Sequence, residues 1–164
     1  MAQRPGLASR HCYRHVERAF TDGTIMKPRI TVLTIGVDDL ERSFAFYRDL
    51  GFPSKGIVGR EFEHGAVAFF ELQDGLRLAI WPRDSLSHDC GLSKTPRSAT
   101  ELSMGHNVRS EQEVDAIMQQ AAACGATIVK AAHKTFWGGY GGYFADPDGH
   151  LWEVVFNPSL IPDD

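Results

Sequence analysis

Two stretches of this chain repeat the same hairpin plan, and this internal repeat limits the choice of fold more than any other feature. The stretches are VAFFELQDGLRLAIW (67–81) and GGYFADPDGHLWEVV (141–155). Identical residues stand 74 positions apart in the two stretches: Phe70 and Phe144, Asp74 and Asp148, and Gly75 and Gly149. An Asp-Gly pair between β-branched or aromatic runs is typical of a β-hairpin. A repeat of this kind indicates that one structural unit occurs twice.

Each hairpin is preceded by a strand and a helix of similar design. In the first half, RITVLTIGV (29–37) is a β-branched run, and DDLERSFAFYRDLGF (38–52) has apolar residues at helical spacing with Gly51 as its stop. In the second half, LSMGHNV (102–108) is the strand, and SEQEVDAIMQQAAACGA (110–126) is a helix that opens with a Ser-x-x-Glu capping box. This order predicts an α+β fold built from two βαβββ modules.

The repeat also divides the chain into segments. We expect an N-terminal extension at 1–26, a first module at 27–81, a polar linker at 82–100, a second module at 101–158 and a tail at 159–164. The extension is rich in arginine and lacks apolar periodicity. We expect it to be dispensable and poorly ordered, with a targeting peptide as the alternative interpretation.

Charge and composition bear on the partners of the chain. The formal net charge is −4, whereas nucleic-acid binding calls for a basic face. No apolar run is long enough to span a bilayer. The cysteines number three and lack Cys-x-x-Cys spacing, which favours a reducing cytoplasm over a secreted disulfide framework. We therefore expect a cytoplasmic protein without a nucleic-acid or membrane partner.

One carboxylate stands in an otherwise apolar final strand. Glu153 lies in DPDGHLWEVVF (146–156), and a buried charge is costly unless it is paired, protonated or bound to a metal. Alternation along the strand places Leu151, Glu153 and Val155 on one face and Trp152, Val154 and Phe156 on the other. The second set suits packing against the helix, so Glu153 is predicted to face away from it.

The two βαβββ modules, the helix opening VDDLERSFAFYRDLGF and the terminal DPDGHLWEV resemble the vicinal oxygen chelate superfamily. That group includes glyoxalase I, fosfomycin-modifying enzymes, extradiol dioxygenases and bleomycin-binding proteins. The resemblance covers residues 27–158. It implies a cupped, barrel-like mixed sheet with one helix per module on the convex face, and a homodimer. It names no single activity, because one fold hosts many functions.

The resemblance also implies a use for Glu153. In metal-dependent relatives the matching residue is a metal ligand, and a second ligand comes from the first strand of the same module, where His106 stands. Carboxylate and imidazole are ligands of Zn, Ni, Mn and Fe(II). Subtracting 74 from both positions gives Ala79 and Val32, and neither side chain binds a metal. The prediction is a half site with three interpretations. A divalent metal binds, or His106 and Glu153 form a pair that lines an organic-ligand pocket without one, or the pair is only structural and is satisfied as buried polar groups usually are.

Other residues are candidates for lining such a pocket. Glycines inside a strand often mark a close approach of backbone to ligand. In TFWGGYGGYF (135–144) they accompany the aromatic residues Trp137, Tyr140 and Tyr143. In the first module, alternation places Arg77 and Trp81 on the face that matches Glu153, although the preferred interpretation of Arg77 is a solvated rim position near its turn. Asp146 and Asp148 are interpreted as turn residues, because one turn supplies too few oxygens for calcium.

Three functions of different classes remain open at this point. The first is a glyoxalase-like protein that binds or transforms a small organic ligand with an incomplete metal site, where Glu153 or His106 could act as acid or base. The second is a lyase, isomerase or dioxygenase that depends on a divalent metal held by these two residues. The third is a non-catalytic interaction module. The sequence does not name the ligand or decide between enzyme and binding protein.

Overall fold

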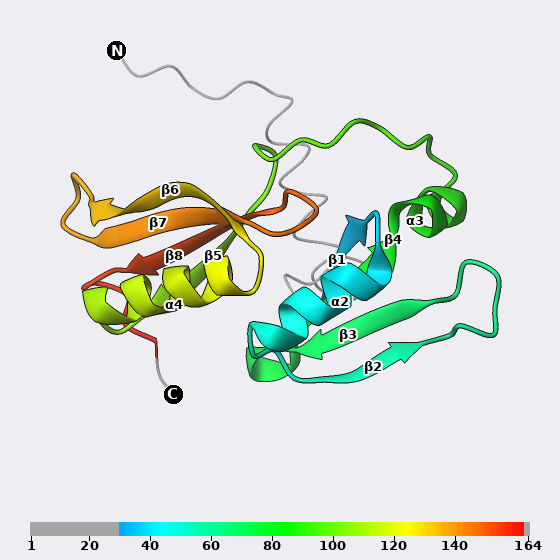
Figure 1. The fold of residues 1–164 in the computed structure, drawn as a ribbon, viewed down its shortest axis with the longest axis horizontal. Helices are drawn as coiled ribbons and strands as arrows, with labels where there is room; N and C mark the ends of the chain where they lie inside the picture. Colours follow the sequence, from blue (N-terminus) through cyan, green and yellow to red (C-terminus); the bar gives the residue numbers. More distant parts are fainter. Residues whose placement is uncertain (1–29, 163–164) are drawn as a thin grey trace, which may run out of the picture. The chain divides into compact units, whose positions relative to one another are not determined.

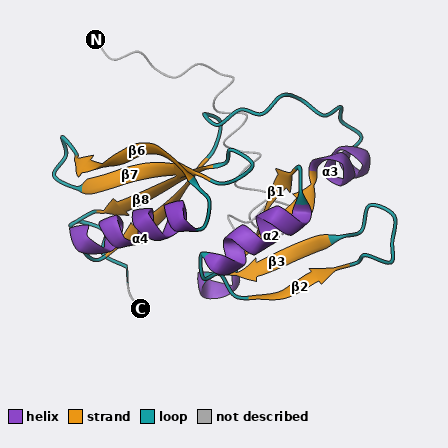
Figure 2. Cartoon of the chain, viewed as in Figure 1, coloured by secondary structure: helices purple, strands orange, loops and turns teal. Residues whose placement is uncertain are grey.

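A computed structural model of the chain describes residues 30–162 and shows eight strands and three helices, with one additional 3-10 turn (Figures 1 and 2). The first module comprises β1 (Val32–Val37), α2 (Leu40–Asp49), β2 (Ser54–Val58), β3 (Val67–Glu71), the turn Gln73–Gly75 and β4 (Arg77–Pro82). The second comprises β5 (Ser103–Val108), α4 (Glu111–Ala123), β6 (Thr127–Lys134), β7 (Tyr140–Ala145) and β8 (Leu151–Phe156). Helix α3 (Arg83–Cys90) lies between them in the chain. The predicted extension 1–26 and the end of the tail lie outside the described residues.

Each module forms its own four-stranded mixed sheet. The strand orders are β1-β4-β3-β2 and β5-β8-β7-β6. In both sheets the first strand runs parallel to the last, and the remaining pairs are antiparallel. The prediction of an α+β fold with two βαβββ modules is therefore confirmed. The barrel-like part of the prediction needs a correction, because both sheets remain open.

Helices α2 and α4 begin and end as their sequences predict. Asp39 caps α2 by accepting a hydrogen bond from the backbone N–H of Arg42 at 3.0 Å. Ser110 caps α4 by accepting one from the backbone N–H of Glu113 at 3.2 Å. Each helix is followed by a glycine with positive φ, Gly51 and Gly125 at 104° and 101°. Glycine reaches this conformation without the strain that a Cβ imposes.

A hydrophobic core joins the two modules. Aromatic side chains of α2 contact the second sheet: Phe46 and Phe144 have ring centroids 6.5 Å apart, and Tyr47 and Trp152 have centroids 6.1 Å apart. Buried residues of both sheets and both long helices belong to this core. The described residues from Thr31 onward accordingly form one compact unit.

The region predicted as a polar linker contains helix α3. Its eight residues show no apolar stripe, which is why the sequence pattern did not indicate a helix. One signal was present, because Gly91 ends the helix with a φ of 71°. No helix within residues 30–162 is both long and apolar enough to cross a membrane.

Candidate functional site

Strand β8 presents Glu153 on the sheet face that points away from the helices. In the strand register Glu153 lies beside Gly105 of β5 and Tyr143 of β7. Its chain neighbours Trp152 and Val154 are buried in the core on the opposite face. The alternation predicted from the sequence thus places Glu153 where it was expected.

Tyr143 holds the Glu153 carboxylate. The phenolic O–H donates to Oε1 of Glu153 at 2.7 Å. This hydrogen bond, together with partial burial, raises the pKa of Tyr143. An ionised Tyr143 would have no proton to donate and would face the negative charge of Glu153. On the other side of Glu153, a Cβ added to Gly105 would meet no heavy atom of residues 30–162 within 4 Å. The carboxylate therefore stands half-buried, fixed on one side and next to open space on the other.

Strand β6 adds two polar residues to the same face. Lys130 lies opposite Tyr143, and His133 lies opposite Gly141. Glu153, Tyr143 and Lys130 thus form one row across three neighbouring strands. Lys130 was not predicted from the sequence, because irregularities in the β6 register interrupt the simple alternation on either side of it.

His106 lies on the opposite face from Glu153. Its register partner is Val154, whereas Glu153 pairs with Gly105. Met104 and Val108, two positions away on either side of His106, are buried in the core. The structure therefore does not bring together the two residues of the predicted half site.

The assignment of Val32 as the counterpart of His106 is wrong, because the two repeats differ in helix length. The helix caps Asp39 and Ser110 are 71 positions apart, whereas the helix stops Gly51 and Gly125 are 74 apart. The three additional residues lie in α4, which has 13 residues where α2 has 10. Before the helix the correct offset is 71.

With this offset the counterpart of His106 is Ile35, and the counterpart of Val32 is Ser103. The ladders agree, since Val32 pairs with the first residue of β4 and Ser103 with the first residue of β8. Ala79 remains the counterpart of Glu153.

The remaining predicted ligand-binding residues do not gather around Glu153. Tyr140 lies on the helix-side face and donates to Asp115 of α4 at 2.8 Å, and this hydrogen bond raises the pKa of Tyr140. Trp137 lies in the turn before β7 and is 46% exposed. Its ring occupies the position that a Cβ at residue 139 would need.

In the first module, Arg77 and Trp81 make contacts of their own. Arg77 Nε lies 3.1 Å from Oε2 of Glu71, and both side chains are about half exposed, as a solvated rim position requires. The Trp81 indole N–H donates to the carbonyl of His64 at 2.9 Å.

Comparison with known proteins identifies the family. The family described as the Glyoxalase/Bleomycin resistance protein/Dioxygenase superfamily matches residues 29–154. A glyoxalase-related enzyme from Fulvimarina pelagi is 36% identical, with 80% of this chain and 90% of that chain covered and a TM-score of 0.69. This chain belongs to the glyoxalase/bleomycin resistance protein/dioxygenase superfamily.

Other solved members share the fold. A glyoxalase/bleomycin resistance protein/dioxygenase from Nocardioides is 25% identical over 91% of this chain and 98% of that chain, with a TM-score of 0.66. A lactoylglutathione lyase from Agrobacterium tumefaciens is 22% identical over 82% and 98%, with a TM-score of 0.58, which shows the fold alone. These names include several activities, so superfamily membership does not select one.

A metal site of the kind expected in this superfamily does not fit the described residues. A catalytic zinc normally has three protein ligands that converge on one point. Within residues 30–162 no three His, Cys, Asp or Glu side chains come together in such a group. His106 and Glu153 cannot share an ion, because the sheet separates them. We therefore derive no chemical step that uses a metal.

Asp148, interpreted from sequence as a turn residue, is also a buried carboxylate that binds the first module. Its side chain is 1% exposed. It accepts hydrogen bonds from the Asp38 backbone N–H at 2.8 Å, from the Arg42 guanidinium at 2.9 Å and from the Ser43 hydroxyl. The carboxylate thus lies at the N-terminus of α2, where the helix dipole favours negative charge.

Asp146 makes a second set of bonds to the same helix. It accepts from the Tyr47 hydroxyl at 2.6 Å, and its Oδ2 lies 2.8 Å from the His150 ring nitrogen. Burial acts to raise the pKa of Asp146, but the bonds from His150 and Tyr47 outweigh it and hold the pKa below its usual value. Burial and the adjacent Asp146 raise the pKa of Tyr47 well above its usual value. Together with Asp148 and Ser43, these residues form what we call the turn–helix cluster.

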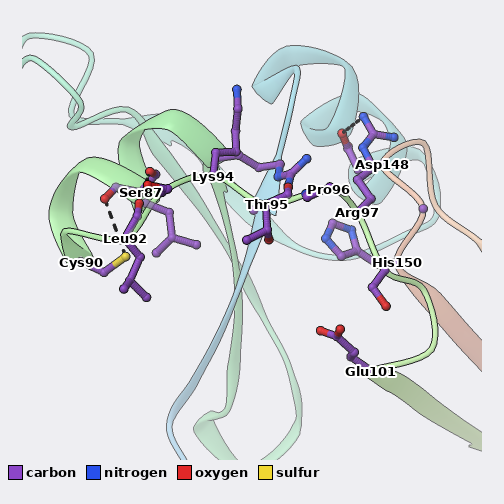
Figure 3. A pocket seen from close by; sticks show the side chains of 16 residues that line it. Ser87, Cys90, Leu92, Lys94, Thr95, Pro96, Arg97, Glu101, Asp148 and His150 are labelled. Atoms are coloured by element: carbon purple, nitrogen blue, oxygen red, sulfur yellow. Dashed lines mark hydrogen bonds and ion pairs between the residues drawn. The ribbon is translucent and has the colours of Figure 1, made fainter.

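A polar pocket of about 360 Å³ lies beside this cluster, between α3, the segment 91–101 and the 148–150 turn (Figure 3). Its basic side chains already have partners. Arg83 and Arg97 both contact Asp38, and Lys94 contacts Asp84 at 2.6 Å. Glu153 does not line this pocket, so it is separate from the candidate site.

Proposed function

We propose that the chain is a glyoxalase-like protein that binds or transforms a small organic ligand on the Glu153 face of its second sheet. The observation that carries the proposal is the Glu153 carboxylate, which Tyr143 orients at 2.7 Å while the space over Gly105 stays open. A fixed, half-buried carboxylate beside an open floor is suited to accept a hydrogen bond or a proton from a ligand.

The neighbouring polar residues restrict the ligand. Lys130 follows Glu153 and Tyr143 across adjacent strands, which places its backbone about 10 Å from that of Glu153, or two strand spacings. A ligand that spans the row would meet an acceptor at one end and a cation at the other. Such a ligand has a hydrogen-bond donor or an acidic C–H near Glu153 and a polar or anionic group near Lys130.

A homodimer is part of this proposal. Strand β6 forms one edge of the second sheet, and its first five residues are exposed. An unpaired edge strand is a surface on which another chain can pair or pack.

A metal-dependent lyase, isomerase or dioxygenase is the second candidate. One observation favours it: His133 carries an imidazole on the same sheet face as Glu153, two strands away. A complete ligand set would then require residues from a second copy of the chain.

One experiment separates the two candidates. Untagged protein is offered Zn, Ni, Mn and Fe(II), and its metal content is measured by elemental analysis. The same protein is then screened by thermal shift against glutathione adducts, catechols, antibiotics and acyl-CoA derivatives. Wild type is compared with Glu153→Gln, and Asp74→Asn, a change in an exposed turn, serves as the control.

We expect no stoichiometric metal and at least one compound that stabilises wild type and the control but not Glu153→Gln. About one metal per chain, lost in Glu153→Gln, would contradict the proposal and select the metal-dependent candidate. Equal stabilisation of all three proteins would place the ligand away from Glu153.

A further inference from the structure

A second cavity lies on the other side of the sheet from Glu153. It has a volume of about 240 Å³ and lies between the end of α2, helix α4 and the helix-side face of the second sheet. Its walls include Phe52, His106, Ile117, Phe144, Trp152 and Val154. The proposed function makes no use of this cavity.

The walls of this cavity are mainly aromatic and aliphatic. Phe144 and Trp152 stack with centroids 6.0 Å apart and ring planes 6° from parallel. Phe52 meets Trp152 edge-on at 5.7 Å. Phe144 and Trp152 are 1% and 6% exposed, so they form an apolar boundary of the cavity while their faces pack within the core. An apolar boundary favours an apolar guest, because binding removes apolar surface from water.

His106 is the polar group that this cavity leaves without a partner. Among residues 30–162 it makes no hydrogen bond, ion pair or ring contact. The other polar side chain in the wall, Gln120, already donates its amide N–H to the Leu50 carbonyl at 3.1 Å. His106 lines the cavity and stays accessible to solvent on one side while apolar side chains cover the other, so its ring can meet a guest without a change in the core.

The protonation state of His106 limits the guest further. Partial burial beside apolar side chains lowers the pKa of His106, and the Glu113 carboxylate opposes this only in part. The ring is therefore neutral at neutral pH and offers one N–H donor and one nitrogen acceptor. A neutral guest with a single hydroxyl or amine suits it better than an ion does.

The volume of the cavity is large enough for a guest with one small aromatic ring. An apolar cavity of about 150 Å³ in another protein holds benzene, so about 240 Å³ is enough for one ring with a short substituent or for two fused rings. From the apolar walls, the unpartnered imidazole and this volume, we propose that the cavity binds a small neutral aromatic molecule with one hydroxyl or amine, and that His106 hydrogen-bonds to that group.

Two probes test this proposal. Phenol carries the hydroxyl, and toluene has nearly the same shape without it. Binding is followed through Trp152 fluorescence in a Trp81→Phe/Trp137→Phe background, which leaves Trp152 as the reporter in the cavity wall. The variant His106→Leu removes the polar contact, and Asp74→Asn in the exposed first turn is the control.

We expect phenol to bind about tenfold more tightly than toluene, which corresponds to one hydrogen bond. His106→Leu should remove this preference and keep toluene binding, and Asp74→Asn should change neither. Because His106 is exposed, its replacement should leave the thermal midpoint near the wild-type value, which shows that the variant is folded.

Two results would overturn the proposal. In the first, Trp152 emission does not respond to either probe at millimolar concentration. In the second, the preference for phenol persists in His106→Leu. Both outcomes are independent of whether Glu153 binds a ligand, because the two sites lie on opposite faces of the sheet.

Discussion

Helices α2 and α4 occupy the same place in the two modules, yet they bury different chemistry. At the offset of 71 positions that relates their caps, Ser43 corresponds to Val114 and Tyr47 to Met118. The two positions in α2 carry hydroxyls, and both hydroxyls bind carboxylates of the second module. The two positions in α4 carry apolar side chains that pack in the core.

The hairpin turns differ in a complementary way. Asp148 is buried and accepts three hydrogen bonds from α2 and its N-terminus, whereas its counterpart Asp74 is exposed. Among the described residues, the turn carboxylates that bind a helix of the other module therefore belong to the second module, and they bind α2. The repeat supplies two similar units, and the differences between them determine how they are joined.

The final strands show the same division of roles. Glu153 stands half-buried on a polar sheet face, whereas its counterpart Ala79 is 1% exposed. The first module thus contributes the helix that binds the second turn. The second module contributes both that turn and the candidate functional face.

The largest expected effect comes from removing the charge at Asp148. One oxygen of Asp148 accepts from Asp38 and Arg42, and the other accepts from Ser43. In Asp148→Asn the amide oxygen can serve only one of these sides, so the NH₂ group faces a donor on the other. Hydrogen bonds to a charged group contribute about 1.5–3 kcal/mol each, and unsatisfied buried groups add to the loss. We expect the free energy of unfolding to fall by about 3 kcal/mol, measured by urea denaturation.

The matched control is Asp74→Asn in the first module. Asp74 is exposed and has a φ of 55°, a conformation that asparagine also tolerates. We expect the stability to change by no more than about 0.5 kcal/mol. Similar losses in both variants would show that the two turns are equivalent, and the comparison between them would fail.

A smaller effect is expected from Tyr47→Phe. This change removes the hydroxyl that donates to Asp146 at 2.6 Å and accepts from the Trp152 indole at 3.3 Å. We expect a loss of about 1–2 kcal/mol at neutral pH. Met118→Leu at the matching position of α4 conserves volume and should cost less than about 1.5 kcal/mol.

The pH dependence of Tyr47→Phe distinguishes a lost hydrogen bond from lost packing. The native pKa of Asp146 lies below its unfolded value, so Asp146 contributes stability above the unfolded pKa of about 4 and loses it as the pH falls through the native pKa. Without the Tyr47 donor the native pKa moves up, and the acid-dependent loss becomes smaller. The wild type and the variant should therefore converge in stability at acid pH, and a constant difference would contradict this account.

Much of the fold could be predicted because its signals are local. Capping residues, glycine stops and the Asp-Gly turns indicated both long helices and both hairpins, and alternation gave the face of Glu153. Helix α3 lacked an apolar stripe and was missed. The face of His106 was also missed. Three additional residues in α4 change the offset between the repeats from 71 to 74, and an error of an odd number of residues places a strand residue on the wrong face of its sheet.

The role of Asp148 could not be predicted from the sequence at all. The Asp-Gly signal is the same in the buried turn and in the exposed one. What differs is a contact with Ser43, 105 positions away, and such contacts depend on how the modules pack. Local patterns identify a turn, but they do not show what its carboxylate binds.

The smallest expected effect concerns Glu153 itself. Glu153→Gln keeps an acceptor for Tyr143 and leaves a half-buried side chain in place, so we expect the stability to change by less than about 1 kcal/mol. The pKa of Tyr143 should fall toward its ordinary value, because the carboxylate that raises it is gone, and NMR titration of ¹³C-labelled tyrosine would detect this. A loss as large as that of Asp148→Asn would make Glu153 a structural residue like Asp148. A small loss with the expected change in the pKa of Tyr143 would leave the Glu153 carboxylate available for a ligand.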